Sequence, residues 1–163
     1  MAEQTIIPNW PGADKGRYWE KGWRIVEGCT PCSPGCQHCW ALAMERRFRR
    51  SPGEGCIRLR EDRLEEPLRR RKPTAYAVWN DLFHEQVPDD FILRAFEVMR
   101  EAKRHTFLVL TKRSDHWHIL KTVESPNIWL GMTAENIDAW TTRVYWGPPV
   151  WRWLSLEPLL ERL

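Results

Sequence analysis

Four of the five cysteines lie in one short segment near the start of the chain. They are Cys29, Cys32, Cys36 and Cys39, all within the stretch from Gly28 to Trp40. Thiolates are soft metal ligands, and close spacing lets one loop surround a small metal centre. The prolines and the glycine between the cysteines favour a tightly turned loop over a helix or a strand. The segment therefore predicts a metal or cluster site.

The spacing of the last three cysteines favours an iron–sulfur cluster. Cys32, Cys36 and Cys39 have the C-x3-C-x2-C pattern that is associated with radical S-adenosylmethionine enzymes. In these enzymes three cysteines hold a four-iron four-sulfur cluster, and the remaining iron binds S-adenosyl-L-methionine. Reductive cleavage of that cofactor gives a 5′-deoxyadenosyl radical, which abstracts hydrogen from the substrate.

Two other interpretations of the same cysteines stay open. All four thiolates together give C-x2-C-x3-C-x2-C, a set that fits structural zinc in number, although zinc sites usually separate their C-x2-C pairs by a longer spacer. The four side chains are also compatible with unliganded or redox-active thiols. Cys56 stands apart, and we expect it to be a small apolar filler.

The bulk composition describes an ordinary single domain. A chain of 163 residues is long enough for one core, and 29% charged and 42% hydrophobic residues are typical of a globular protein. Of the eleven tryptophans, those within apolar runs are expected in the core or in a pocket wall: Trp79, Trp129, Trp151 and Trp153. No segment approaches the roughly 20 apolar residues of a membrane span, and no signal peptide opens the chain, so we expect a cytoplasmic protein without a membrane partner. In that reducing compartment, clustered cysteines indicate metal ligation rather than disulfides.

Two basic clusters stand out against a net charge of only +3. They are Arg46–Arg50, which includes Phe48, and Arg69–Lys72. A phosphate contact and a solvated helix face explain each cluster about equally well.

Short apolar runs alternate with helical patterns along the chain, which predicts an α/β fold with about five parallel strands. The expected strands are Trp23 to Val26, Tyr76 to Trp79, Thr106 to Leu110, Ile128 to Met132 and Val150 to Leu156. Helices are expected over Ala41 to Arg50, from Phe91 to Met99, near Ser114 to Leu120, and from Ile137 to Val144. Functional groups of such folds gather at the carboxyl ends of the strands.

Six ordered blocks of the chain resemble a known family. They are the cysteine loop, Arg63–Leu68 leading to Arg71–Pro73, Asp81–His84, Leu110–Arg113, Trp129–Gly131 with Glu135–Asn136, and Ser155–Leu159. The family is an uncharacterised group, common in bacteriophages and prophages, that is described as radical-SAM-like. The resemblance implies a partial TIM-type (β/α) barrel with its cysteine loop after the first strand, a four-iron four-sulfur cluster, and S-adenosyl-L-methionine as cofactor.

The family pattern bears on the third cluster ligand and on length. Its three recurring cysteines match Cys29, Cys36 and Cys39, so Cys29 is favoured and Cys32 is the alternative. Family members continue past the Ser155–Leu159 block by at least one strand and helix. Residues 1–163 are therefore expected to form one radical-SAM-like domain without the last strand–helix unit, completed by a second chain or left as an inactive remnant.

The resemblance also suggests cofactor-binding residues at the strand ends. Asp81 would hold the amino group of the cofactor, and Lys112 and Arg113 would meet its carboxylate or a phosphorylated substrate. Contacts to ribose or adenine would come from the following residues: Glu135, Asn136 and Glu157. A capping role for Asp81, a solvated loop for the basic pair and a structural turn at Glu157 are the corresponding alternatives.

The histidines carry less signal in the sequence. His84 is a candidate proton relay, although a loop histidine with ordinary hydrogen bonds explains it better. His105, His116 and His118 have no other candidate ligand near them in sequence, so we expect surface or capping roles.

These observations lead to one functional hypothesis and its rivals. The favoured hypothesis is a radical-SAM-type enzyme with an electron donor such as a flavodoxin, acting on an unknown substrate, for which a nucleotide or nucleic acid is the suggestion. The rivals are a zinc-stabilised nucleic-acid-binding module without catalysis, and a remnant that keeps its cluster without cleaving the cofactor.

Overall fold

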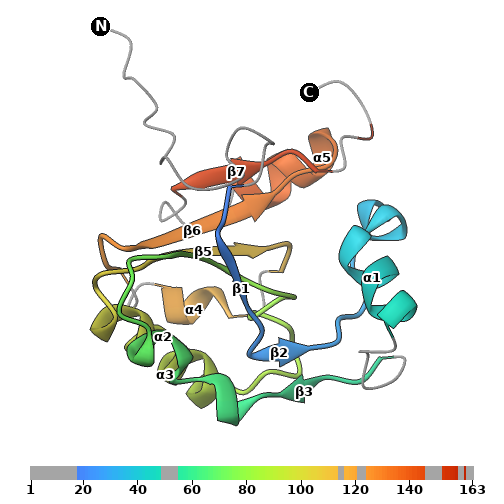
Figure 1. The fold of residues 1–163 in the computed structure, drawn as a ribbon. Helices are drawn as coiled ribbons and strands as arrows, with labels where there is room; N and C mark the ends of the chain where they lie inside the picture. Colours follow the sequence, from blue (N-terminus) through green and yellow to red (C-terminus); the bar gives the residue numbers. More distant parts are fainter. Residues whose placement is uncertain are drawn as a thin grey trace, which may run out of the picture.

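Five parallel strands form the main sheet of the computed structural model (Figure 1), which describes residues 18–48, 55–113, 116–120, 124–145, 152–157 and 160. They are β1 (Lys21–Trp23), β4 (Ala75–Val78), β5 (Thr106–Thr111), β6 (Ile128–Thr133) and β7 (Trp153–Ser155). The order in the sheet is β1-β4-β5-β6-β7, and each neighbouring pair is parallel. This stepwise order is that of a (β/α) barrel rather than a doubly wound sheet, and five strands make part of one. The predicted α/β fold with about five parallel strands is confirmed.

Helices connect the strands, as the alternating pattern predicted. They are α1 (Trp40–Phe48), α2 (Glu66–Arg69), α3 (Asp89–Glu101), α4 (Trp117–Leu120), and α5 (Ile137–Ala139) continuing into a π-helix over Trp140–Tyr145. Short 3₁₀ helices span Pro34–His38 and Glu61–Arg63. The longest, α3, begins after Pro88, whose fixed φ suits a helix start. Within the described ranges, none of the helices has the length and apolar character needed to cross a bilayer.

The first predicted strand is divided in the structure. Sequence analysis placed one strand over Trp23 to Val26, whereas β1 ends at Trp23 and a separate β2 (Val26–Glu27) pairs antiparallel with β3 (Arg58–Leu59). The reason is the limited length of the pairing between β1 and β4. The partner strand β4 ends opposite Trp23, so the chain turns away and forms its next hydrogen bonds with residues 58–60 instead. The cysteine loop consequently follows β2. At the other end of the sheet β7 is shorter than the predicted Val150 to Leu156, and residues 150 and 151 lie outside the described part of the chain.

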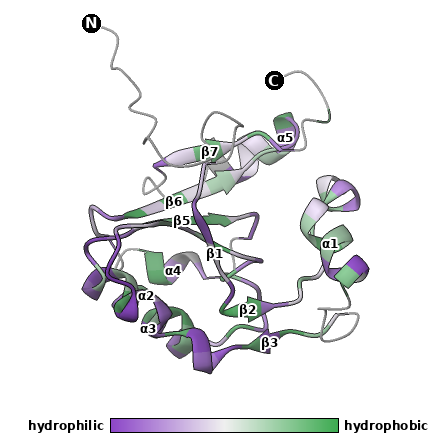
Figure 2. Ribbon diagram, in the orientation of Figure 1, coloured by the Kyte–Doolittle hydropathy of each residue, from purple (hydrophilic) through white to green (hydrophobic). Residues whose placement is uncertain are grey.

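One face of the sheet packs against α2 and α3 and forms the core (Figure 1). Every second side chain of β4 and β5 points into it, including Tyr76 and Phe107, and α3 contributes Phe91 and Phe96. Figure 2 shows both hydrophobic and hydrophilic residues along α3, as expected for a helix with one face on a core. Large apolar side chains therefore anchor this face.

The opposite face of the sheet carries small residues and borders a cavity. Ala77 on β4 pairs with Gly22 on β1, and Gly131 on β6 pairs with Trp153 on β7. A Cβ atom added at Gly22 would overlap the indole of Trp79, and one added at Gly131 would overlap the indole of Trp153. Because only glycine leaves this room, two indole rings lie against the strands and wall the cavity.

Candidate functional site

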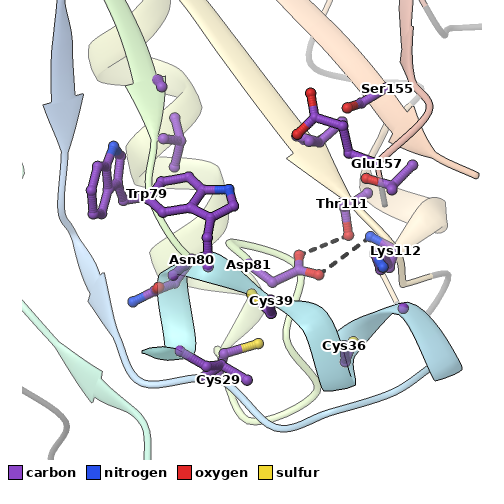
Figure 3. Close-up of a pocket in the computed structure, with 18 of the residues that line it drawn as sticks. Cys29, Cys36, Cys39, Trp79, Asn80, Asp81, Thr111, Lys112, Ser155 and Glu157 are labelled. Atoms are coloured by element: carbon purple, nitrogen blue, oxygen red, sulfur yellow. Dashed lines mark hydrogen bonds between the residues drawn. The ribbon is translucent and has the colours of Figure 1, made fainter. Parts of the chain in front are cut away.

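A cavity of about 350 Å³ opens at the carboxyl ends of the strands, and the cysteine loop closes one side of it. Figure 3 shows Cys29, Cys36 and Cys39 gathered at one end of this cavity, with Asp81 and Lys112 beside them. Cys32 also lines it. The volume lies within the range of pockets that take small molecules. The structure therefore brings all four predicted cysteines to one site.

The local fold of the loop explains how the cysteines come together. Gly28 leaves β2 with a φ of 89°, a left-handed conformation that glycine adopts without strain. Cys36 lies within the 3₁₀ turn over Pro34–His38, and Cys39 directly follows it. The Cys39 amide donates to the Cys36 carbonyl at 3.2 Å, which holds the two residues close together. The helix α1 begins directly afterwards at Trp40.

Cys36 is prepared to act as a thiolate. A hydrogen bond from the thiol of Cys32 lowers the pKa of Cys36 to about 4, helped by the hydroxyl of Ser33 and the nearby charge of Lys112. The same hydrogen bond raises the pKa of Cys32. Burial raises the pKa of Cys29 to about 12, with a further contribution from Asp81. Because the thiolate is the form that ligates metals, Cys36 is the first ligand available at neutral pH.

The spacing of the sulfurs distinguishes a single ion from a cluster. Four thiolates around one zinc ion, with Zn–S bonds of about 2.3 Å, stand about 3.8 Å apart. Within the described residues, the one group of three such side chains whose ligand atoms lie within 4.8 Å of one another is Asp89, His116 and His118, so no three cysteines are that close. A multi-iron cluster holds its thiolates farther apart, because each binds a different iron. The cysteine arrangement is therefore compatible with a group larger than a single ion.

Asp81 lies at the base of the cavity and is largely committed to other groups. Its Oδ1 accepts hydrogen bonds from the Thr111 hydroxyl at 2.7 Å and from the Phe83 amide at 3.0 Å. Among the residues that the structure describes, the contacts of its Oδ2 are longer, 3.4 Å to the Lys112 amide and 3.7 Å to Arg113 Nε. Burial raises the pKa of the Asp81 carboxyl, against the effect of these hydrogen bonds. Oδ2 is therefore the oxygen with room for a ligand.

The two basic residues after β5 separate into different environments. Lys112 lines the cavity, and its Nζ lies 3.3 Å from the Ser33 hydroxyl and 3.6 Å from Glu135. Arg113 is buried and does not line the cavity. Its Nη2 donates to the carbonyl and hydroxyl oxygens of Thr30, at 2.7 and 2.8 Å, and its Nη1 pairs with Glu85. Arg113 thus braces the cysteine loop against the segment after β4.

The residues predicted to contact ribose or adenine lie in three different environments. They are Glu135, Asn136 and Glu157. Glu157 lines the cavity and is exposed. Glu135 is fully buried and pairs with Arg143 at 2.7 Å, outside the cavity lining. Asn136 caps α5, where its Oδ1 accepts from the Ala139 amide at 2.8 Å. Only Glu157 of the three faces the cavity.

An aromatic wall is the feature that sequence reasoning captured only in part. Trp79 and Trp153 were expected in the core or a pocket wall, and both line the cavity. Trp19 and Trp40 join them, with ring centroids 6.3 Å apart and nearly parallel, while Trp40 meets Trp79 edge-on at 5.3 Å. The position of Trp40 directly after Cys39 was the available signal. Of the other two tryptophans predicted there, Trp129 is exposed, and Trp151 lies outside the described residues.

Asn80 is a second contributor, at the carboxyl end of β4 where functional groups were expected. It has a φ of 60°, and its Nδ2 donates to the Val26 carbonyl at 2.9 Å and to Glu45 Oε1 at 3.0 Å. This residue therefore links the end of β4 to β2 and to α1, on either side of the cysteine loop. Asparagine tolerates the left-handed conformation better than most residues.

The arginine clusters are engaged in part with neighbouring acids. Arg69 pairs with Glu65 at 3.3 Å, and Lys72 lies 3.7 Å from Glu20. Arg49 and Arg50 of the other cluster lie outside the described residues.

Comparison with known proteins identifies a family without an assigned activity. Residues 14–163 match the model of the family described as protein of unknown function (DUF5131), and the chain belongs to that family. Searches of curated proteins and of solved structures found no match. The expectation of an uncharacterised family is confirmed.

Proposed function

Starting from membership of this family, we propose that the protein is an iron–sulfur protein of the radical S-adenosylmethionine type. The observation that carries the proposal is the convergence of four cysteines on one cavity at the carboxyl ends of a parallel sheet. In parallel α/β folds this edge is where ligands bind.

Cys29, Cys36 and Cys39 would hold the cluster. Cys36 ionises most readily, and Cys39 follows it by one turn. Cys29 is favoured over Cys32 as the third ligand, because Cys32 is exposed and its thiol donates to Cys36. When bound, such a cluster supplies the electron for reductive cleavage of S-adenosyl-L-methionine.

The remaining cavity residues have the chemistry to hold that cofactor. Oδ2 of Asp81 would accept hydrogen bonds from its amino group, and the Lys112 ammonium, held near Ser33, would pair with its carboxylate. The aromatic wall of Trp19, Trp40 and Trp79 offers faces on which a purine base stacks. Glu157, which lines the cavity, would accept hydrogen bonds from ribose hydroxyls. Arg113, Glu135 and Asn136 would act through positioning of the loops.

The wider partners remain part of the same proposal. A flavodoxin-like donor would supply electrons, and a nucleotide or nucleic acid is the proposed substrate class, since stacking faces and exposed arginines suit a base and a phosphate. Among the described strands β1 and β7 are the sheet edges, and a second chain could extend the sheet at β7.

Anaerobic reconstitution tests the proposal. The protein is incubated with iron and sulfide, reduced with dithionite and given S-adenosyl-L-methionine, and 5′-deoxyadenosine and methionine are measured. We expect about four irons per chain and release of 5′-deoxyadenosine, both lost in Cys36→Ala and kept in the control Cys56→Ala. Iron uptake without 5′-deoxyadenosine would identify an inactive remnant, and no iron uptake with a tightly held zinc that is lost in Cys36→Ala would identify a zinc module. Either result contradicts the proposal.

A further inference from the structure

Three side chains at the starts of α3 and α4 converge at a point outside the cysteine cavity. Asp89 is the first residue of α3, and His116 and His118 flank the start of α4. Oδ1 of Asp89 lies 2.7 Å from His116 Nδ1, and Oδ2 lies 2.8 Å from His118 Nε2. One ligand atom from each residue falls within 4.8 Å of the other two. None of these residues lines the cysteine cavity.

The protonation of His116 makes this arrangement informative. Its Nε2 lies 3.2 Å from the backbone carbonyl oxygen of His84. A carbonyl only accepts, so Nε2 carries the proton, and the neutral ring then presents the lone pair of Nδ1 to Asp89. Two acceptors would face each other at 2.7 Å. Such a pair is satisfied either by a second proton on the imidazole, in a direct ion pair, or by a metal ion that both atoms coordinate from one side together with His118.

The surroundings meet the usual requirements of a metal site. A ligating histidine normally donates its other ring N–H to a carbonyl or carboxylate, which fixes its orientation, and the His84 carbonyl has that position. His116 is buried, while Asp89 and His118 are half-exposed or more, so water has access to the remaining coordination positions. Two imidazole nitrogens and one carboxylate suit zinc and the other borderline divalent ions rather than magnesium or calcium.

We propose that Asp89, His116 and His118 bind a divalent cation of the zinc type, at a site separate from the cysteine loop. The ion would join the start of α3 to the start of α4. It would also fix the segment between β4 and α3, because the His84 carbonyl accepts from His116. The ring of the same His84 reaches the cysteine loop, since His84 Nε2 lies 2.8 Å from the Thr30 hydroxyl. The ion would have a structural role, because it would stabilise segments that border the cavity. It does not depend on the proposed function.

Zinc stoichiometry by difference tests this site without interference from the cysteines. The full chain and its variants are dialysed against equal free zinc, and bound zinc is measured per chain. Asp89→Asn and His118→Gln should each bind one zinc fewer than the wild type, because each removes a ligand. Asp90→Asn is the matched control, an exposed neighbouring acid outside the cluster, and should bind as much as the wild type. His118 is exposed, so its substitution leaves the fold intact even where Asp89→Asn does not.

Ring ¹⁵N chemical shifts provide the second readout. Zinc should move the shift of His116 Nδ1 and His118 Nε2 in the wild type, and leave His105 unchanged. Equal zinc binding in the wild type and both ligand variants would overturn the proposal. So would a His116 ring that is doubly protonated and responds to pH but not to zinc, since the cation beside Asp89 would then be a proton.

Discussion

The cysteine loop and the Asp89–His116–His118 cluster are two candidate metal centres that differ in ligand chemistry and in spacing. The loop offers soft sulfur ligands spread around a cavity, whereas the cluster offers nitrogen and oxygen ligands packed within 4.8 Å. Ligand spacing sets the size of the group that can be held, and ligand softness sets its identity. On this basis we propose a multi-atom cluster in the loop and a single borderline ion at the Asp89–His116–His118 cluster.

The two centres are also connected. Thr30 in the cysteine loop and His84 share a contact of 2.8 Å, and His84 accepts in turn from His116. Arg113 ties the same Thr30 to Glu85. A change at one centre can therefore reach the other through a few hydrogen bonds.

Loss of the paired cysteines should have the largest effect. In Cys36→Ala combined with Cys39→Ala, iron binding should be abolished, because two of three cluster ligands are gone. Zinc binding at the Asp89 cluster should persist in the same variant. Iron and zinc are measured together by elemental analysis. Iron retained at the wild-type level would break the distinction between the two centres.

Removal of the brace between the centres should strongly destabilise the fold. Arg113→Met leaves the buried Asp81 without its cation, a type of loss that costs about 3–5 kcal/mol. Arg94→Met is the matched control, since its pairing with Glu61 is exposed and should be worth at most about 1 kcal/mol. Urea unfolding of both variants gives the comparison. Equal losses would show that the buried Arg113 stabilises the fold no more than an exposed ion pair does.

The thiols of the metal-free loop should differ sharply in reactivity. Cys36, with its pKa lowered to about 4, is thiolate at neutral pH, while Cys29, raised to about 12, is thiol. Alkylation by iodoacetamide should therefore be on the order of a hundredfold faster at Cys36. Between about pH 6 and 8 the Cys36 rate should stay flat, and the Cys29 rate should rise with each pH unit. Mass spectrometry of the labelled peptides distinguishes the sites, and a pH-dependent rate at Cys36 would contradict the account.

Coupling between the centres should be the smallest effect. Thr30→Val removes the hydroxyl that meets both His84 and Arg113, a loss of about 1 kcal/mol in a typical case. In the wild type, zinc at the Asp89 cluster should slow the release of iron by a chelator, and in Thr30→Val this protection should shrink. Unchanged protection would show that the centres are independent.

The sequence predicted the sheet because its strands are short apolar runs with clear ends. It also located the cysteine loop, since four thiols within eleven residues are typical of a metal or cluster site. It did not find the division of the first strand, which depends on where β4 ends. It assigned His116 and His118 to surface or capping roles, because their third partner, Asp89, is 27 residues away from His116 and comes close only through the packing of α3 and α4.

The same limit applies to residues at the strand ends. Lys112 and Arg113 are adjacent in sequence, yet one lines the cavity and the other is a buried brace. Glu135 follows β6 as predicted, but its carboxylate is fully buried between Lys112 and Arg143 of the next helical segment and does not line the cavity. Side-chain partners over such distances cannot be seen in a single sequence.

Electron paramagnetic resonance of the anaerobically reconstituted, dithionite-reduced protein tests the central claim most directly. The account predicts the signal of a reduced four-iron four-sulfur cluster that changes shape when S-adenosyl-L-methionine is added, because the cofactor binds the iron left open by Cys29, Cys36 and Cys39. A protein without such a signal, holding one zinc ion on its cysteines, would contradict it.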